Sequence, residues 1–67
     1  MKLKENDVVS LKYDDLDVGV KKEYTGTVLD IQCGEASVEF TDDEGNTLEK
    51  AMDKYYPEDD LIVKWHS

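Results

Sequence analysis

The chain has 67 residues, with 17 Asp and Glu against 8 Lys and no Arg, so its formal net charge is −9. This length predicts one domain over residues 1–67, and a domain of this size buries only about 60% of the surface that its unfolded chain exposes. Phosphate backbones are bound by Lys and Arg, so the excess of acids argues against direct binding of DNA or RNA.

The chain has one cysteine, Cys33, which excludes an internal disulfide and supplies one thiolate to any metal site. A single unpaired cysteine is typical of a reducing compartment, although the sequence leaves any redox role of Cys33 open. No segment approaches the roughly 20 apolar residues of a membrane span, and no targeting segment is evident. We therefore expect a cytoplasmic protein without membrane association.

The first predicted element is a strand over residues 7–13. Side chains alternate between the two faces of a strand, so one face should carry Val9, Leu11 and Tyr13. Residues 14–23 predict a long polar loop. We expect its alternating apolar residues to pack against the body of the protein. These residues are Leu16, Val18 and Val20.

A hairpin follows, with strands over residues 26–32 and 36–40 and a turn at residues 33–35. Val38 and Phe40 should point inward together. Gly26 opens the first of these strands, where a side chain would obstruct a bend or the close approach of a neighbouring strand.

Residues 42–46 form an acidic turn that lacks the ligand pattern of a calcium-binding loop, so we interpret it as an ordinary hairpin turn. Residues 47–56 are ambiguous. One helical face would carry Leu48, Met52 and Tyr55. Two pairs of like charges argue against a helix, because residues four apart are neighbours on a helix surface and like charges repel there. The pairs are Glu49 with Asp53 and Lys50 with Lys54. The sequence leaves strand and helix open here, and we favour a fourth strand over residues 47–52.

The last two elements are a short helical turn over residues 56–60 and a closing strand over residues 61–65. Pro57 suits the start of a helical turn, and the acids after it suit the positive end of the peptide dipoles. One face of the strand should carry Leu61, Val63 and Trp65. Pairing of the last strand with the first would close a small five-stranded, all-β barrel.

Four segments resemble a small bacterial SH3-like family that is catalogued as a domain of unknown function: residues 6–11, 23–31, 38–40 and 58–61. The resemblance implies an SH3-like barrel with a short helical turn before the last strand. More distantly, the segment Gly26-Thr27-Val28 is similar to the KOW segment of ribosomal proteins and transcription elongation factors. Those nucleic-acid binders are typically basic, whereas this chain is acidic.

The catalytic signals are weak, because the chain has one His, one Cys and no Arg. A Cys33–His66 nucleophile pair would need the penultimate residue to be held within hydrogen-bonding reach of the thiol. Loop carboxylates without an apolar pocket are poor acids and bases. We expect a protein that is not an enzyme and has no cofactor and no metal site.

The acids fall into three groups, at residues 14–17, 42–44 and 58–60, and each group lies in a predicted loop. Solvated loop charges of this kind keep a small β protein soluble, and they can also form an acidic face for a basic partner. Aromatic side chains could line a peptide groove beside the first group, although packing is their commoner role. The candidate partner-binding residues are Tyr13, Asp14, Asp15, Asp17, Tyr55, Tyr56 and Trp65.

Three classes of function remain. The leading hypothesis is a protein-interaction module whose acidic surface binds a partner with a basic surface. The second is an acidic inhibitor, immunity protein or nucleic-acid mimic that occupies a cationic surface. The third is a structural subunit that self-associates through strand edges, and the sequence leaves a homodimer open.

Overall fold

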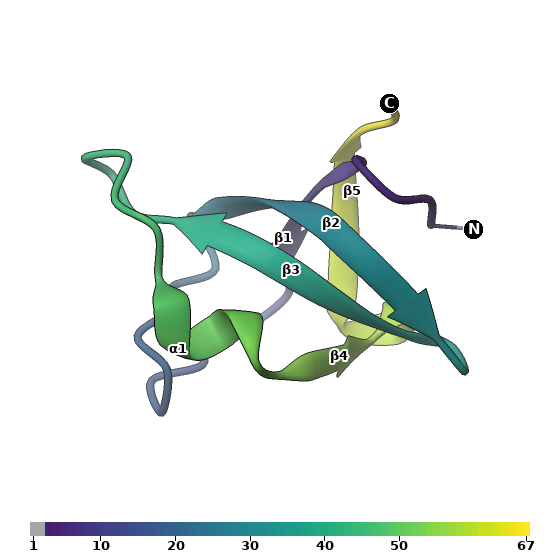
Figure 1. Ribbon diagram of the computed structural model, residues 1–67. Coiled ribbons are helices and arrows are strands. Elements are labelled where there is room, and N and C mark those ends of the chain that lie inside the picture. Colours follow the sequence, from purple (N-terminus) through teal and green to yellow (C-terminus); the bar gives the residue numbers. More distant parts are fainter. Residues whose placement is uncertain (1–2) are drawn as a thin grey trace.

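The computed structural model describes residues 3–67, which form a mostly β protein (Figure 1). Its five strands are β1 (Val8–Leu11), β2 (Thr25–Gln32), β3 (Glu35–Thr41), β4 (Tyr55–Pro57) and β5 (Leu61–Trp65). They form one antiparallel sheet in the order β4-β3-β2-β1-β5. A short helix α1 (Glu49–Met52) precedes β4, and the 3-10 turn η1 (Glu58–Asp60) joins β4 to β5. The predicted pairing of the last strand with the first is confirmed, but no pairing of β4 with β5 closes the sheet within residues 3–67.

The long hairpin of β2 and β3 is the centre of the sheet. Its turn consists of Cys33 and Gly34, because Gln32 already pairs with Glu35. Both turn residues have positive φ, at 51° and 79°, as the twist-matched two-residue hairpin turn requires. The predicted three-residue turn is therefore one residue too long, and both strands extend slightly beyond their predicted ends.

One face of the sheet forms the core. Val9, Val28, Val38 and Phe40 are fully buried there, as their alternation along the strands predicts. Gly26 pairs with Phe40, and a Cβ atom at Gly26 would lie 2.6 Å from Val38 Cγ1. The predicted close approach at Gly26 is thus confirmed.

Residues 47–52 do not form the predicted fourth strand. The segment makes one isolated bridge, between Thr41 and Thr47, and then turns into α1. Ala51 is fully buried against the core, and the backbone N–H of Leu48 donates to the carbonyl of Phe40. The like-charge pairs did not prevent this, because the helix ends at Met52 and leaves Asp53 and Lys54 outside it. The fourth strand instead begins at Tyr55.

The segment around β1 departs from prediction in two ways. The strand ends at Leu11, so Tyr13 lies beyond it and is 43% exposed. In the following loop Val20 is fully buried and pairs with Asp15, whereas Leu16 is 76% exposed. The loop is therefore pinned mainly by Val20, and the prediction for Leu16 is wrong, because a tight turn between Asp15 and Val20 carries Leu16 outward.

Trp65 does not share a face of β5 with Leu61 and Val63, so this prediction is also wrong. Val63 pairs with Val9, but Trp65 pairs with Val8, so a bulge adds one residue, Lys64, to β5. Neighbouring residues of β1 point to opposite faces, so the bulge moves Trp65 to the outer face of the sheet, where it is 70% exposed.

Helices long and apolar enough to cross a membrane are absent from residues 3–67.

Candidate functional site

Two of the predicted site residues, Asp15 and Tyr56, lie in the interior and not on the surface. Asp15 is 7% exposed and Tyr56 is 1% exposed. The Tyr56 hydroxyl donates to Asp15 Oδ2 at 2.8 Å, and Lys54 Nζ reaches the same oxygen at 2.5 Å. The Tyr56 ring packs edge-on against Phe40, with ring centroids 5.8 Å apart. These contacts fasten the loop after β1 to β4, so both residues serve packing and cannot be reached by a partner.

The buried contact shifts the pKa of both partners. The hydrogen bond from Lys54 lowers the pKa of Asp15, with a further contribution from the Tyr56 hydroxyl, against the opposing effect of burial. Burial raises the pKa of Tyr56, and the hydrogen bond to Asp15 raises it further. At neutral pH Asp15 is therefore a carboxylate, and Tyr56 is a neutral phenol that donates to it.

Tyr13, Asp14 and Asp17 remain on the surface, at the base and in the bend of the loop after β1. The Tyr13 hydroxyl donates to Asp60 Oδ2 at 2.9 Å, and this hydrogen bond raises the pKa of Tyr13. Asp14 Oδ1 accepts from the backbone N–H of Lys22 at 2.8 Å, which ties the two ends of the loop together. Asp14 and Asp17 are exposed, so they can act on an approaching partner.

Tyr55 and Trp65 lie apart from that loop. Tyr55, on β4, is 38% exposed, and its hydroxyl donates to Asp30 Oδ2 on β2 at 2.7 Å. Trp65 lies on β5, opposite Val8. The predicted aromatic residues thus do not share one groove. Each of the three tyrosines instead bonds to a different aspartate, namely Asp60 for Tyr13, Asp30 for Tyr55 and Asp15 for Tyr56.

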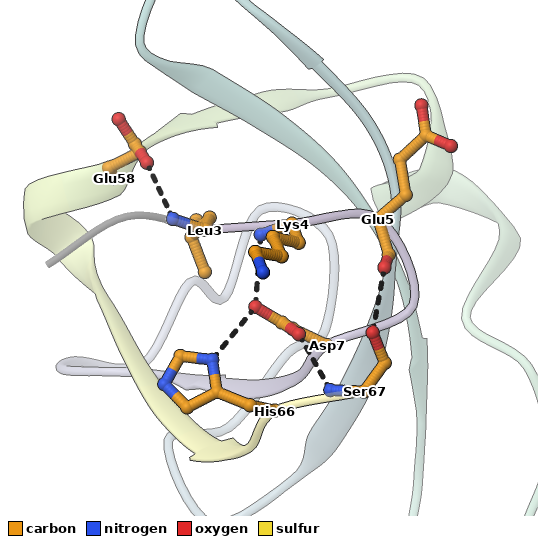
Figure 2. A network of polar contacts seen from close by, with 7 residues as sticks. All are labelled: Leu3, Lys4, Glu5, Asp7, Glu58, His66 and Ser67. Carbon is orange, nitrogen blue, oxygen red and sulfur yellow. Dashed lines mark hydrogen bonds and ion pairs between the residues drawn. The ribbon is translucent and has the colours of Figure 1, made fainter.

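A polar cluster that the sequence did not predict joins the two ends of the described chain (Figure 2). The carboxylate of Asp7 is fully buried just before β1. Its Oδ2 accepts from the backbone N–H of Lys4 at 2.9 Å, and its Oδ1 accepts from that of Ser67 at 2.8 Å. His66 Nδ1 lies 3.3 Å from Oδ2. The backbone hydrogen bond from Ser67 is the largest influence that lowers the pKa of Asp7, while burial acts in the opposite direction.

This cluster also decides the geometry of the one histidine. His66 faces Asp7, whereas Cys33 is exposed at the tip of the hairpin of β2 and β3. An aspartate that orients a histidine is a familiar catalytic pair, but a nucleophile must lie on the other side of the ring. Hydrogen bonds of His66 to a Ser, Thr or Cys side chain are absent within residues 3–67.

The exposed acids are largely uncompensated. Within residues 3–67 two ion pairs form, Lys54 with Asp15 and His66 with Asp7, and both use a buried carboxylate. Asp42 instead accepts from the backbone N–H groups of Asn46 and Glu44, which lowers its pKa and shapes its own turn. The surface acids therefore keep their charge available to solvent and to a partner.

Groups of three or more His, Cys, Asp or Glu side chains with metal-binding geometry are absent from the part of the chain that the structure describes. Comparisons with protein-family models, with curated proteins and with solved structures found no match. The chemistry of the described residues is therefore the basis for assigning a function.

Proposed function

We propose that the protein is a non-enzymatic interaction module, built on an SH3-like barrel, whose acidic surface binds a basic segment of a partner protein. The observation that carries the proposal is the uncompensated charge. The chain has a net charge of −9, and no exposed carboxylate forms an ion pair within residues 3–67. Such a surface raises the local concentration of cationic partners and speeds their association.

The strand order supports the SH3-like part of the proposal. β1 pairs with both β2 and β5, η1 lies between β4 and β5, and β5 runs steeply across the direction of β2 and β3 (Figure 1), an arrangement compatible with an SH3-like barrel. The segments that resemble the bacterial SH3-like family lie on β1, on β2, on β3 and at the junction of η1 with β5. Small barrels of this kind use the loops at their rims for recognition.

The loop after β1 is the part of the surface best suited to begin this contact. Asp14 and Asp17 are exposed on either side of Leu16, whose side chain is 76% exposed, and Tyr13 lies at the base of the loop. An apolar side chain between two carboxylates fits a segment that carries both apolar and basic residues. Because Asp15 is buried, the acidic contribution of this loop comes from Asp14 and Asp17.

Affinity capture from the native cell, with identification of the bound proteins by mass spectrometry, would supply the partner. Its affinity is then measured with purified proteins at low and moderate salt. We expect the Asp14→Lys/Asp17→Lys variant to weaken binding about tenfold, and we expect added salt to weaken binding of the unaltered protein.

The matched control is Glu35→Lys/Glu39→Lys, which makes the same change in net charge on β3. A loss confined to the Asp14/Asp17 variant assigns the contact to the loop, while equal losses indicate a long-range effect of net charge. An affinity that is unchanged by added salt and by both double substitutions would refute the proposal.

A further inference from the structure

A cavity of about 190 Å³ lies beside β5 and η1. Its residues come from the N-terminal segment, from the position directly after β1, from η1 and from β5, and they are Leu3, Lys12, Glu58, Asp59, Leu61 and Val63. Leu3 and Leu61 are buried and belong to the core, and Val63 is partly buried and packs against the core. The lining of the cavity thus combines three apolar residues with three charged ones.

The volume of the cavity limits what it can hold. Sites for small molecules and cofactors commonly measure about 300–1,000 Å³. At about 190 Å³ this cavity is too small for most of them, but it has room for one aliphatic side chain. A side chain that enters it would extend the hydrophobic core through Leu61 and Val63.

The strand that forms one wall of the cavity is also an edge of the sheet. β5 is the last strand in the sheet order, with β1 as its one neighbour within residues 3–67. An edge of this kind can pair with an extended segment of another protein, whose alternate side chains then point to opposite faces. On one face they would meet Leu61, Val63 and the cavity. On the other they would meet Ile62 and Trp65, which are 39% and 70% exposed.

The charged residues that line the cavity specify the chemistry of such a segment. Glu58 Oε1 accepts from the backbone N–H of Leu3 at 3.2 Å, whereas the exposed Asp59 carboxylate forms no hydrogen bond or ion pair within residues 3–67. Two lysines lie at this site: Lys12 lines the cavity, and Lys64 is a residue of β5. Despite Lys12, the two carboxylates of Glu58 and Asp59 leave the η1 end net negative, so a basic residue is favoured there and disfavoured beside Lys64.

We propose that the edge of β5 and its cavity receive an extended segment of a partner protein, which places one aliphatic side chain in the cavity and a Lys or Arg beside Asp59. This inference rests on the proposed function and names the site at which the basic segment binds. Pairing along the edge supplies the main-chain hydrogen bonds, the cavity selects the aliphatic side chain, and Asp59 selects the cation.

Nuclear magnetic resonance with the intact protein can test the site with defined probes. The first probe is a short capped peptide of alternating valine and threonine with a central leucine and a lysine near one end. In the second peptide serine replaces the leucine, and in the third glutamate replaces the lysine. We expect the first peptide to shift the amide signals of β5 and the methyl signals of Leu61 and Val63. The serine peptide should lose the methyl shifts, and the glutamate peptide should bind about tenfold more weakly.

Two protein variants separate the site from net charge. Asp59→Lys should weaken binding of the lysine peptide about tenfold and improve binding of the glutamate peptide, whereas Asp43→Lys should change either affinity less than about twofold. Both residues are exposed, Asp59 on η1 and Asp43 in the turn after β3, so both variants should fold.

Shifts centred on residues 14–19 with none on β5 would overturn this inference and leave the proposed function standing. Absence of binding at millimolar peptide would overturn the inference as well. Preferential binding of the glutamate peptide to the unaltered protein would overturn both proposals.

Discussion

Asp7 Oδ1 accepts a hydrogen bond of 2.8 Å from the backbone N–H of Ser67, which lies 60 residues further along the chain. The other oxygen of the same buried carboxylate accepts from the backbone N–H of Lys4. One side chain therefore fixes both ends of the described chain beside β1. The Ser67 hydroxyl adds a second connection, because it donates to the carbonyl of Glu5 at 3.2 Å. In a domain of this size, such a connection replaces part of the stability that a larger core would provide.

The substitution Asp7→Asn tests this role. An amide has one oxygen and one NH2 group, so it can accept from only one of the two backbone N–H groups and would direct a donor at the other. We expect the melting temperature to fall by roughly 10 °C. The control is Asp43→Asn in the exposed turn, which removes the same charge and should leave the melting temperature within about 2 °C. Equal melting temperatures for the two variants would show that the carboxylate is not required.

Stability should also depend on acid pH in a definite direction. The pKa values of Asp7, Asp15, Asp30 and Asp42 all lie below the ordinary value of 3.8 in the folded protein. As the pH falls, the unfolded chain binds these protons first. The associated stability is therefore complete above pH 3.8, and it is lost as the pH falls through the lower folded values.

Thermal melts between pH 7 and pH 2 would measure this dependence. Above the acid limb, a decrease in pH toward the isoelectric point of about 4.3 removes self-repulsion, so we expect a maximum of stability near that pH. Asp7→Asn should flatten the acid limb, because one of the four groups is gone. A stability that rises steadily from pH 4 to pH 2 would contradict the pKa directions.

Two adjacent tyrosines provide a matched comparison of a buried and an exposed hydrogen bond. Tyr56→Phe removes the hydroxyl that donates to the buried Asp15 and leaves that carboxylate with Lys54. We expect the free energy of unfolding to fall by about 1–2 kcal/mol. Tyr55→Phe removes an equivalent hydrogen bond to Asp30 at the surface, where water replaces it, so its effect should be much smaller. Urea denaturation of both variants measures the difference, and a larger loss for Tyr55→Phe would contradict the assignment of Tyr56 to the interior.

Local pattern was sufficient to predict the central hairpin and the last strand, because alternation and turn chemistry act between neighbours in sequence. It was insufficient at residues 47–52, where burial of Ala51 outweighs the strand signal and the weak repulsion between like charges. It failed again at Trp65, since the bulge depends on how β5 aligns with β1, and neither strand shows that alignment alone. Alignment between distant strands is a tertiary property.

The candidate site was predicted less well for the same reason. Asp15 is close in sequence to Asp14 and Asp17, yet its bridge to Val20 turns it toward Tyr56. Nothing in the local sequence distinguishes Asp7, since an aspartate before a strand is ordinary and its partners lie at Lys4 and Ser67. A buried carboxylate is recognised only when the backbone groups that satisfy it have been placed.

Gly26→Ala tests the packing at the centre of the sheet. The added Cβ would lie 2.6 Å from Val38 Cγ1 and 2.8 Å from the backbone oxygen of Glu39, and the backbone atom cannot move away without disturbing β3. We expect a loss of about 3 kcal/mol, from overpacking. Gly34→Ala is the comparison, because Gly34 has open space around it and φ of +79°, so backbone strain of about 1 kcal/mol is its main penalty. Equal losses would indicate that the contact at Gly26 is relieved by movement of β2.

Salt should stabilise this protein. At an ionic strength of 0.01 M the screening length is about 30 Å, which exceeds the 27 Å long axis of the molecule, so every acidic group repels the others. At 0.15 M the length is about 8 Å, and most of that repulsion is removed. The two ion pairs within residues 3–67 use buried carboxylates and are screened far less. We expect the melting temperature to rise by on the order of 5 °C between these conditions.

The same rise in sodium chloride and choline chloride would identify screening as the cause, since specific cation binding would separate the two salts. A melting temperature that falls with salt would mean that the surface acids are paired in solution, and it would remove the charge on which binding of a basic partner depends.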